Sequence, residues 1–148
     1  QMVLEKYKSV IGLFSDNVLT DHDGNLFDTC SYAAVSAIIT SKIPKWEMKD
    51  DKPVLIENQE SDTPITTIPV SVTMGRIDDF IIADPNIDEW ECLDARITIT
   101  TNSDGNIVAL QKGGNNGFTL DQIVKCSEIS ISSGSKIREI IKQATQSN

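Results

Sequence analysis

The strongest constraint on the fold is a helical pattern near the C-terminal end of the sequence. Thr119 and Gln122 have the spacing of a capping box, in which two side chains satisfy free N–H groups at a helix start. Apolar or small residues then recur at helical spacing for about six turns. These residues are Leu120, Ile123, Val124, Ser127, Ile131, Gly134, Ile137, Ile141 and Ala144. Such a helix must be covered by another layer, and serines within 130–135 are expected to weaken it locally.

A second helix is predicted over residues 28–41. Asp28 is a residue type that favours the N-cap, and Pro44 stands just beyond the segment and ends it. The apolar positions share one face, and they are Cys30, Ala33, Ala34, Ala37 and Ile38. Because this face is mostly alanine, we expect the helix to pack closely against a sheet.

Short runs rich in Val, Ile and Thr predict strands over residues 67–74, 80–83, 96–101 and 107–111. The last two flank Asp104-Gly105, which is among the strongest short hairpin signals. Further strands are predicted over 10–19, and a short hairpin over 46–56 with its turn at 50–53, followed by an exposed loop over 57–64. The element order predicts an α+β fold, with two main helices on one face of a sheet that is either mostly antiparallel or mixed.

The charge balance bears on partners. The chain has 22 acidic and 13 basic side chains, a net charge of -9, and its Lys and Arg residues are scattered. A protein that binds nucleic acid by itself usually carries a basic patch, so most positive charge for any RNA contact must come from partners. No apolar run is long enough to span a membrane. Cys30, Cys92 and Cys126 are far apart and predict buried thiols in a reducing compartment.

The segments that could carry chemistry are few. Residues 84–94 hold five acids directly after a predicted strand, which could bind magnesium or supply a general acid, but also fit an exposed acidic loop or short helix. Residues 113–117 are rich in glycine and precede a helix, yet no P-loop lysine follows, so a connecting loop is favoured over anion binding. His22 is the single histidine and is predicted to lie in an exposed turn. No metal site or cofactor is predicted.

Several segments, taken in order, resemble an RNase PH-type domain. They are residues 23–28, 42–44, 68–73, 83–86 with Glu89, 94–99 and 111–114. The resemblance as a whole spans roughly residues 18–144, and the chain is most similar to the ribosomal RNA-processing proteins of the exosome ring, in the 3′-5′ exoribonuclease family. The resemblance implies a ribosomal protein S5 domain 2-like fold. It also implies that residues 1–148 form a single domain, the C-terminal part of such a subunit with its N-terminal part absent.

The departures from this family concern its catalytic acids. The pattern of active members, Asp-Leu-Asp/Asn-x-x-Glu-Asp, places its first and last Asp for metal-assisted phosphorolysis. Asp84 matches the first of these, but Trp90 stands at the last and Arg96 at the place of a further acid. An indole can neither ligate magnesium nor relay a proton. The resemblance therefore implies no catalytic residue, with Asp84 as a vestigial candidate and Glu89 and Asp94 as residues that shape the loop.

These features predict a non-catalytic structural subunit of the exosome ring, without catalytic activity of its own, that supports 3′-to-5′ RNA processing and degradation. The implied partners are other RNase PH-like subunits in a hetero-oligomeric ring, with RNA contacted mainly through the assembled complex and no membrane involved. Lys112, Gly113 and Gly114 are possible RNA or anion contacts. The expected location is intracellular: nucleus, nucleolus and cytoplasm in a eukaryote, or cytoplasm in an archaeon.

Two alternative functions remain open. The first is a diverged phosphate-dependent 3′-5′ exoribonuclease that uses Asp84 together with Asp88 or Glu89. The second is a protein-interaction domain unrelated to RNA, because a fold does not determine a function.

Overall fold

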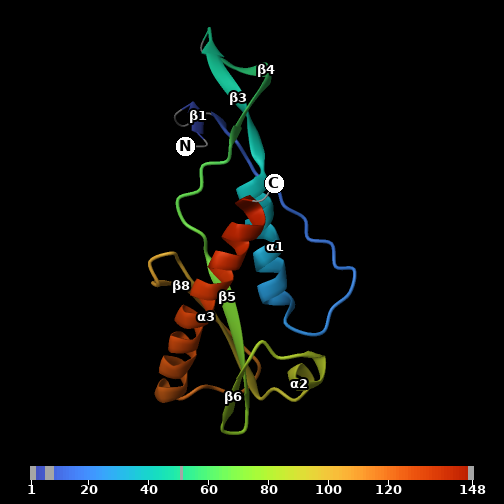
Figure 1. Ribbon diagram of the computed structural model, residues 1–148, viewed down its shortest axis with the longest axis vertical. Coiled ribbons are helices and arrows are strands. Elements are labelled where there is room, and N and C mark those ends of the chain that lie inside the picture. The colour runs from blue at the N-terminus through green and yellow to red at the C-terminus, as the bar shows by residue number, and fades with distance from the viewer. Residues whose placement is uncertain (1–2, 6–8, 51, 147–148) are drawn as a thin grey trace.

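The computed structural model describes residues 3–5, 9–50 and 52–146, arranged as an α+β fold (Figure 1). In chain order the elements are β1 (Val3–Glu5), β2 (Ser9–Val10), α1 (Leu26–Thr40), β3 (Lys42–Lys49), β4 (Lys52–Asp62), β5 (Val70–Ile77), β6 (Phe80–Ala83), α2 (Ile87–Glu91), β7 (Ala95–Thr101), β8 (Ile107–Gly113) and α3 (Leu120–Gln146). The central sheet has the order β6-β5-β7-β8. Every strand pair in this part of the chain is antiparallel, so the predicted α+β class is confirmed and the mixed sheet is wrong.

The apolar face of the central sheet forms the core together with α3. Val72, Met74, Ile97 and Ile99 pack there against Cys126 of the helix. The predicted weak point at residues 130–135 is absent, since α3 continues through it to Gln146. A Cβ atom at Gly134 would lie 2.7 Å from the hydroxyl of Thr101, so small residues at the centre let the helix approach the sheet.

The face that α3 buries agrees with the predicted one only in part, since Gly134 and Ile141 are buried as expected. Leu120, Val124 and Ile131 belong to the predicted stripe, but they are exposed. Ser130 and Arg138 are buried in their place. Arg138 of α3 faces the sheet because the sheet has carbonyl and hydroxyl groups at one end that accept its hydrogen bonds. Hydropathy alone does not predict this orientation.

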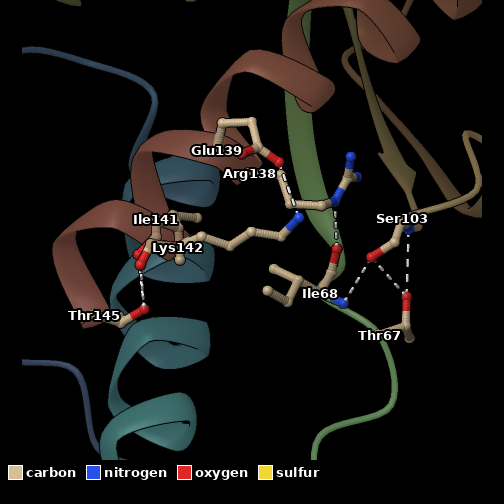
Figure 2. Close-up of polar contacts among 8 residues, drawn as sticks. All are labelled: Thr67, Ile68, Ser103, Arg138, Glu139, Ile141, Lys142 and Thr145. Carbon is tan, nitrogen blue, oxygen red and sulfur yellow. Dashed lines mark hydrogen bonds and ion pairs between the residues drawn. The ribbon is translucent and has the colours of Figure 1, made fainter.

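Arg138 joins α3 to that end of the sheet (Figure 2). Only 5% of Arg138 is exposed, and its Nε donates to the carbonyl of Ile68 at 2.8 Å. Its Nη2 donates to the carbonyl of Thr101 at 2.9 Å. Burial lowers the pKa of Arg138, and the neighbouring Glu139 opposes that shift. Ser103 contacts the same region and accepts a hydrogen bond from the backbone N–H of Ile68.

The other long helix, α1, contacts the opposite face and the free edge of β5. Asp28 was predicted to be an N-cap, but it lies in the first turn and accepts hydrogen bonds from the backbone N–H and the hydroxyl of Thr73, at 2.7 and 2.8 Å. Tyr32 donates to the carbonyl of Ser71 at 2.6 Å. Side chains alternate between faces along a strand, so Ser71 and Thr73 point away from α3. The expectation that both helices cover one face is therefore wrong.

The predicted alanine face of α1 is also wrong. Ala33 and Ala37 are exposed, and Cys30, Ala34 and Ile38 are half-buried. The helix binds the sheet through polar side chains instead, because the strand edge presents backbone groups that need partners. A groove of about 460 Å³ remains beside α1, and it is lined on the sheet side by Ser71, Thr98 and Thr100.

Two exposed segments lie beyond the central sheet. The predicted hairpin is confirmed and is longer than expected, since β3 pairs with β4 from Lys42–Asp62 to Lys49–Lys52. The loop predicted over 57–64 is therefore wrong up to Asp62, while Asp51 of the predicted turn lies outside the described residues. Figure 1 shows this hairpin projecting away from the sheet. The strands predicted over 10–19 are wrong beyond Val10, because residues 11–19 have no strand partner in the described structure.

All three thiols are free, but only Cys126 is buried; Cys30 is half-buried and Cys92 is exposed, so the prediction of buried thiols holds for one of three. A search of the described residues finds no helix with the length and apolar character that a membrane crossing requires.

Candidate functional site

The acidic segment begins with a turn at Asp84. This residue adopts a left-handed backbone with φ of 55°, which non-glycine residues seldom do and Asp does more readily than most. Its backbone N–H donates to the carbonyl of Thr73 at 3.0 Å, which ties the end of β6 to β5. Its carboxylate accepts a hydrogen bond from Asn25 Nδ2 at 2.7 Å. Asp84 therefore joins β6 to the loop before α1.

Asn25 connects Asp84 with a second carboxylate that the sequence did not single out for this site. Its Nδ2 also donates to Asp28 at 2.9 Å, while its Oδ1 is buried and has no partner among the described residues. Burial raises the pKa of Asp28, hydrogen bonds from Asn25 and Thr73 lower it, and the charge of Asp84 raises it. Burial likewise raises the pKa of Tyr32. One amide thus holds two carboxylates that are distant in sequence.

Glu89 closes the first turn of α2. Its carboxylate accepts the backbone N–H of Asn86 at 2.9 Å, and the side chain of Asn86 accepts the backbone N–H of Glu89 at the same distance. This reciprocal arrangement is a capping box. Asp88 lies beside it and is exposed. Glu89 is therefore already engaged by the start of its own helix.

Asp94 connects three loops. Its carboxylate accepts the backbone N–H of Asp78 at 2.8 Å and the side-chain amide of Asn116 at 3.4 Å. It also lies 3.4 Å from Arg76 Nη1, which makes an ion pair. The β5–β6 turn, the segment before β7 and the loop after β8 are held together at this side chain.

Trp90 and Arg96, where the sequence resemblance predicts the acids of active family members, contact each other. The Arg96 guanidinium carbon lies 4.8 Å from the centre of the Trp90 ring and 5.6 Å from that of Phe27. Such distances allow a favourable cation–π interaction. Gly113 is paired with Arg96 across the sheet, and a Cβ atom there would lie 2.6 Å from Arg96 Nε. An arginine in contact with two aromatic rings thus stands where the resemblance predicts a carboxylate. Phe27 belongs to this cluster and was not predicted from the sequence.

The glycine-rich loop is held by its own backbone. Lys112 donates to the carbonyl of Gly114 at 2.5 Å, and Gly114 has a positive φ of 83° close to the backbone of Asp94 and Ala95. Anion contact by Lys112, Gly113 and Gly114 stays a prediction. His22 is exposed, as predicted. Within residues 3–5, 9–50 and 52–146, no cluster of three or more His, Cys, Asp or Glu side chains could hold a metal ion.

The family is identified by a match to domain 2 of the 3′ exoribonuclease family, which covers residues 67–133. These residues include β5, α2, the hairpin of β7 and β8, and the first half of α3. Residues 67–133 therefore match the second domain of this RNase PH-like family, and the resemblance drawn from the sequence is confirmed.

The particular relatives are archaeal exosome proteins. The chain is 36% identical over 148 residues to the exosome complex component Rrp42 of Thermococcus gammatolerans, covering 99% of this chain and 54% of that protein. It thus spans about half the length of the curated relatives it matches. A solved archaeal exosome core has a chain with a TM-score of 0.71 and 31% identity, covering 82% of this chain and 47% of that one. The Archaeoglobus fulgidus exosome with RNA bound to its active site gives a TM-score of 0.69 and 33% identity, over 80% of this chain and 44% of that one.

Proposed function

We propose that this chain belongs to a non-catalytic ring subunit of an exosome, in which it supports 3′-to-5′ RNA processing and degradation. In this role the chain forms a single domain, the C-terminal part of the subunit, that holds the cleft of an active RNase PH-like partner and helps to line an RNA channel. The similarity to Rrp42 over nearly the whole chain supports this assignment. The archaeal relatives favour the cytoplasm as its location.

The observation that carries the non-catalytic part is the contact between Arg96 and Trp90, 4.8 Å from guanidinium carbon to ring centre. Phosphoryl transfer with a metal ion needs carboxylates that ligate the metal or move a proton. A guanidinium repels a metal ion, and an indole offers no lone pair for it. Replacing both acids by this pair therefore removes the chemistry while keeping the loop packed.

The remaining acids support the same reading. Asp84 is held by Asn25, and Glu89 is held by Asn86 in the capping box. Each carboxylate already accepts a hydrogen bond that fixes a loop or a helix start, which weighs against the alternative of a diverged exoribonuclease. The contacts of Glu89 and Asp94 suit residues that shape the loop.

The test uses the full chain, with and without the active RNase PH-like subunit of the same organism. With single-stranded RNA, magnesium and phosphate, we expect no nucleoside diphosphate from the chain alone. Size-exclusion chromatography with light scattering should show a hetero-oligomer with the partner, and Asp84→Ala in this chain should leave nucleotide release by that complex unchanged. Release by the chain alone that is lost on Asp84→Ala contradicts the proposal, as does a monomer with no affinity for the partner.

A further inference from the structure

Arg96 is the cation at the centre of the Trp90 and Phe27 cluster, and among the described residues its charge has no acidic partner. The ion pairs among the described residues are Lys49–Glu47, Arg76–Asp94 and Lys142–Glu139. Arg96 takes part in none of them, and its contacts are the two rings. Arg96 is half-buried, and none of its nitrogens is a buried atom that lacks a partner.

The acids near Arg96 are occupied elsewhere. Asp94 is bonded to Asp78 and Arg76, Glu89 to Asn86, and Asp84 to Asn25. A net charge of -9 makes an unpaired, half-buried arginine in this acidic segment unusual. The Phe27 and Trp90 ring centres lie 5.6 and 4.8 Å from the guanidinium carbon, and the N–H groups of any guanidinium point outward in its plane. A planar guanidinium edge matches two oxygens of one phosphate group.

We propose that Arg96 binds a phosphate group of single-stranded RNA, with Phe27 and Trp90 as the residues that position its guanidinium. The choice of RNA rests on the proposed function. It is also favoured by the surroundings, since Phe27 and Trp90 line a cavity of about 170 Å³ together with His22 and Ile87. A cation beside aromatic surfaces is the combination that single-stranded nucleic acids use, with phosphates on the cation and bases against the rings.

The proposal predicts a specific pattern of binding. The chain has two tryptophans, so Trp46→Phe leaves Trp90 as its single fluorescent indole. In that background, titration with a single-stranded RNA of about eight nucleotides at low salt should change the Trp90 emission. Arg96→Gln should weaken binding about tenfold and reduce the salt slope by about 0.7, the contribution of one phosphate contact. Arg96→Lys should give an intermediate affinity, because it keeps the charge and loses the paired edge.

Lys125→Gln is the matched control, because Lys125 is an exposed cation on α3 and its loss changes the net charge equally. It should bind RNA like the parent. Equal weakening by Arg96→Gln and Lys125→Gln, or no binding at all, overturns the proposal. So does binding of an acidic peptide, or of inorganic phosphate alone, that depends on Arg96 while RNA binding does not. Should Arg96→Gln fail to fold by circular dichroism, Arg96→Lys against the parent decides the question.

This test and the test of the proposed function fail separately. Loss of the RNA site with an intact hetero-oligomer rejects the role of Arg96 and leaves the ring subunit in place. RNA binding through Arg96 by a chain that never associates with an RNase PH-like partner supports the site and rejects the ring role.

Discussion

Along its two central strands, β5 and β7, the central sheet has two faces that differ in chemistry. On the face toward α3 these strands carry buried apolar residues, which are Val70, Val72, Met74, Ile97 and Ile99. The face toward α1 carries hydroxyl groups, from Ser71, Thr73, Thr98 and Thr100. These hydroxyls pair across the strands, at 2.9 Å for Ser71 with Thr100 and 2.8 Å for Thr73 with Thr98.

The two faces contribute differently, one mainly to stability and the other mainly to the positions of side chains. Burial of apolar area stabilises a fold in proportion to that area, but it does not determine which atoms contact each other. A hydrogen bond contributes less net free energy, but it fixes which atoms meet. The α3 face therefore holds the domain together, whereas the α1 face orients Asp28, Asn25 and Asp84 and leaves an open groove beside the helix. Met74 and Thr73 are neighbours with no exposed surface on opposite faces, so they test this contrast directly.

The largest effect is expected for Met74→Ala. Removing a fully buried side chain from the apolar face should lower the free energy of unfolding by about 3 kcal/mol, from lost burial and the cavity left behind. Urea denaturation followed by circular dichroism measures it. Leu120→Ala is the control, since Leu120 is 75% exposed and its truncation should change stability by less than about 0.5 kcal/mol. Equal losses for both variants would show that α3 does not cover this core.

A smaller effect is expected for Thr73→Val on the opposite face. The substitution keeps the shape but removes the hydroxyl that donates to Asp28 and bonds Thr98. Stability should fall by about 1–2 kcal/mol, because a buried carboxylate loses one of its donors. The same denaturation assay applies, with exposed Thr66→Val as the control. A loss as large as that of Met74→Ala would remove the distinction between the two faces.

The smallest effect concerns the pH dependence of stability. The pKa of Asp28 is raised in the folded state, chiefly by burial, so the native protein favours the protonated carboxyl. Its contribution is fully present below the unfolded pKa of about 3.9 and is lost as pH rises through the folded pKa. The free energy of unfolding of the wild type, relative to that of Asp28→Asn, should therefore increase as the pH falls from 7 toward 4. A difference that moves the other way, or stays constant, contradicts the raised pKa.

Local features were predicted well because their partners are close in sequence. The capping box of α3 is present, with Thr119 N–H donating to Gln122 at 2.9 Å and Gln122 N–H donating to Thr119 at 3.3 Å. The hairpin at Asp104-Gly105 and the strand Phe80–Ala83 also follow the prediction. The role of Asp28 was missed, since its partner Thr73 is 45 residues away and no local pattern indicates that contact.

The candidate site was predicted in part for the same reason. The sequence singled out Asp84, Trp90 and Arg96. Asn25 and Phe27 lie in a segment that resembles the family, but nothing in the sequence assigned them to this site. Asn25 and Asp84 are 59 residues apart. Only the pairing of β5 with β6 and the docking of α1 on the edge of β5 bring these side chains together.

The amino-acid sequence by itself determined that Trp and Arg stand at positions 90 and 96, where the family resemblance predicts carboxylates. It also determined most helices and strands, because propensity, capping and turn chemistry act over a few residues. The tertiary structure alone decided which face each helix covers and which rings hold Arg96. Those outcomes depend on strand edges and buried polar groups finding partners, and that requirement is satisfied only when distant segments meet.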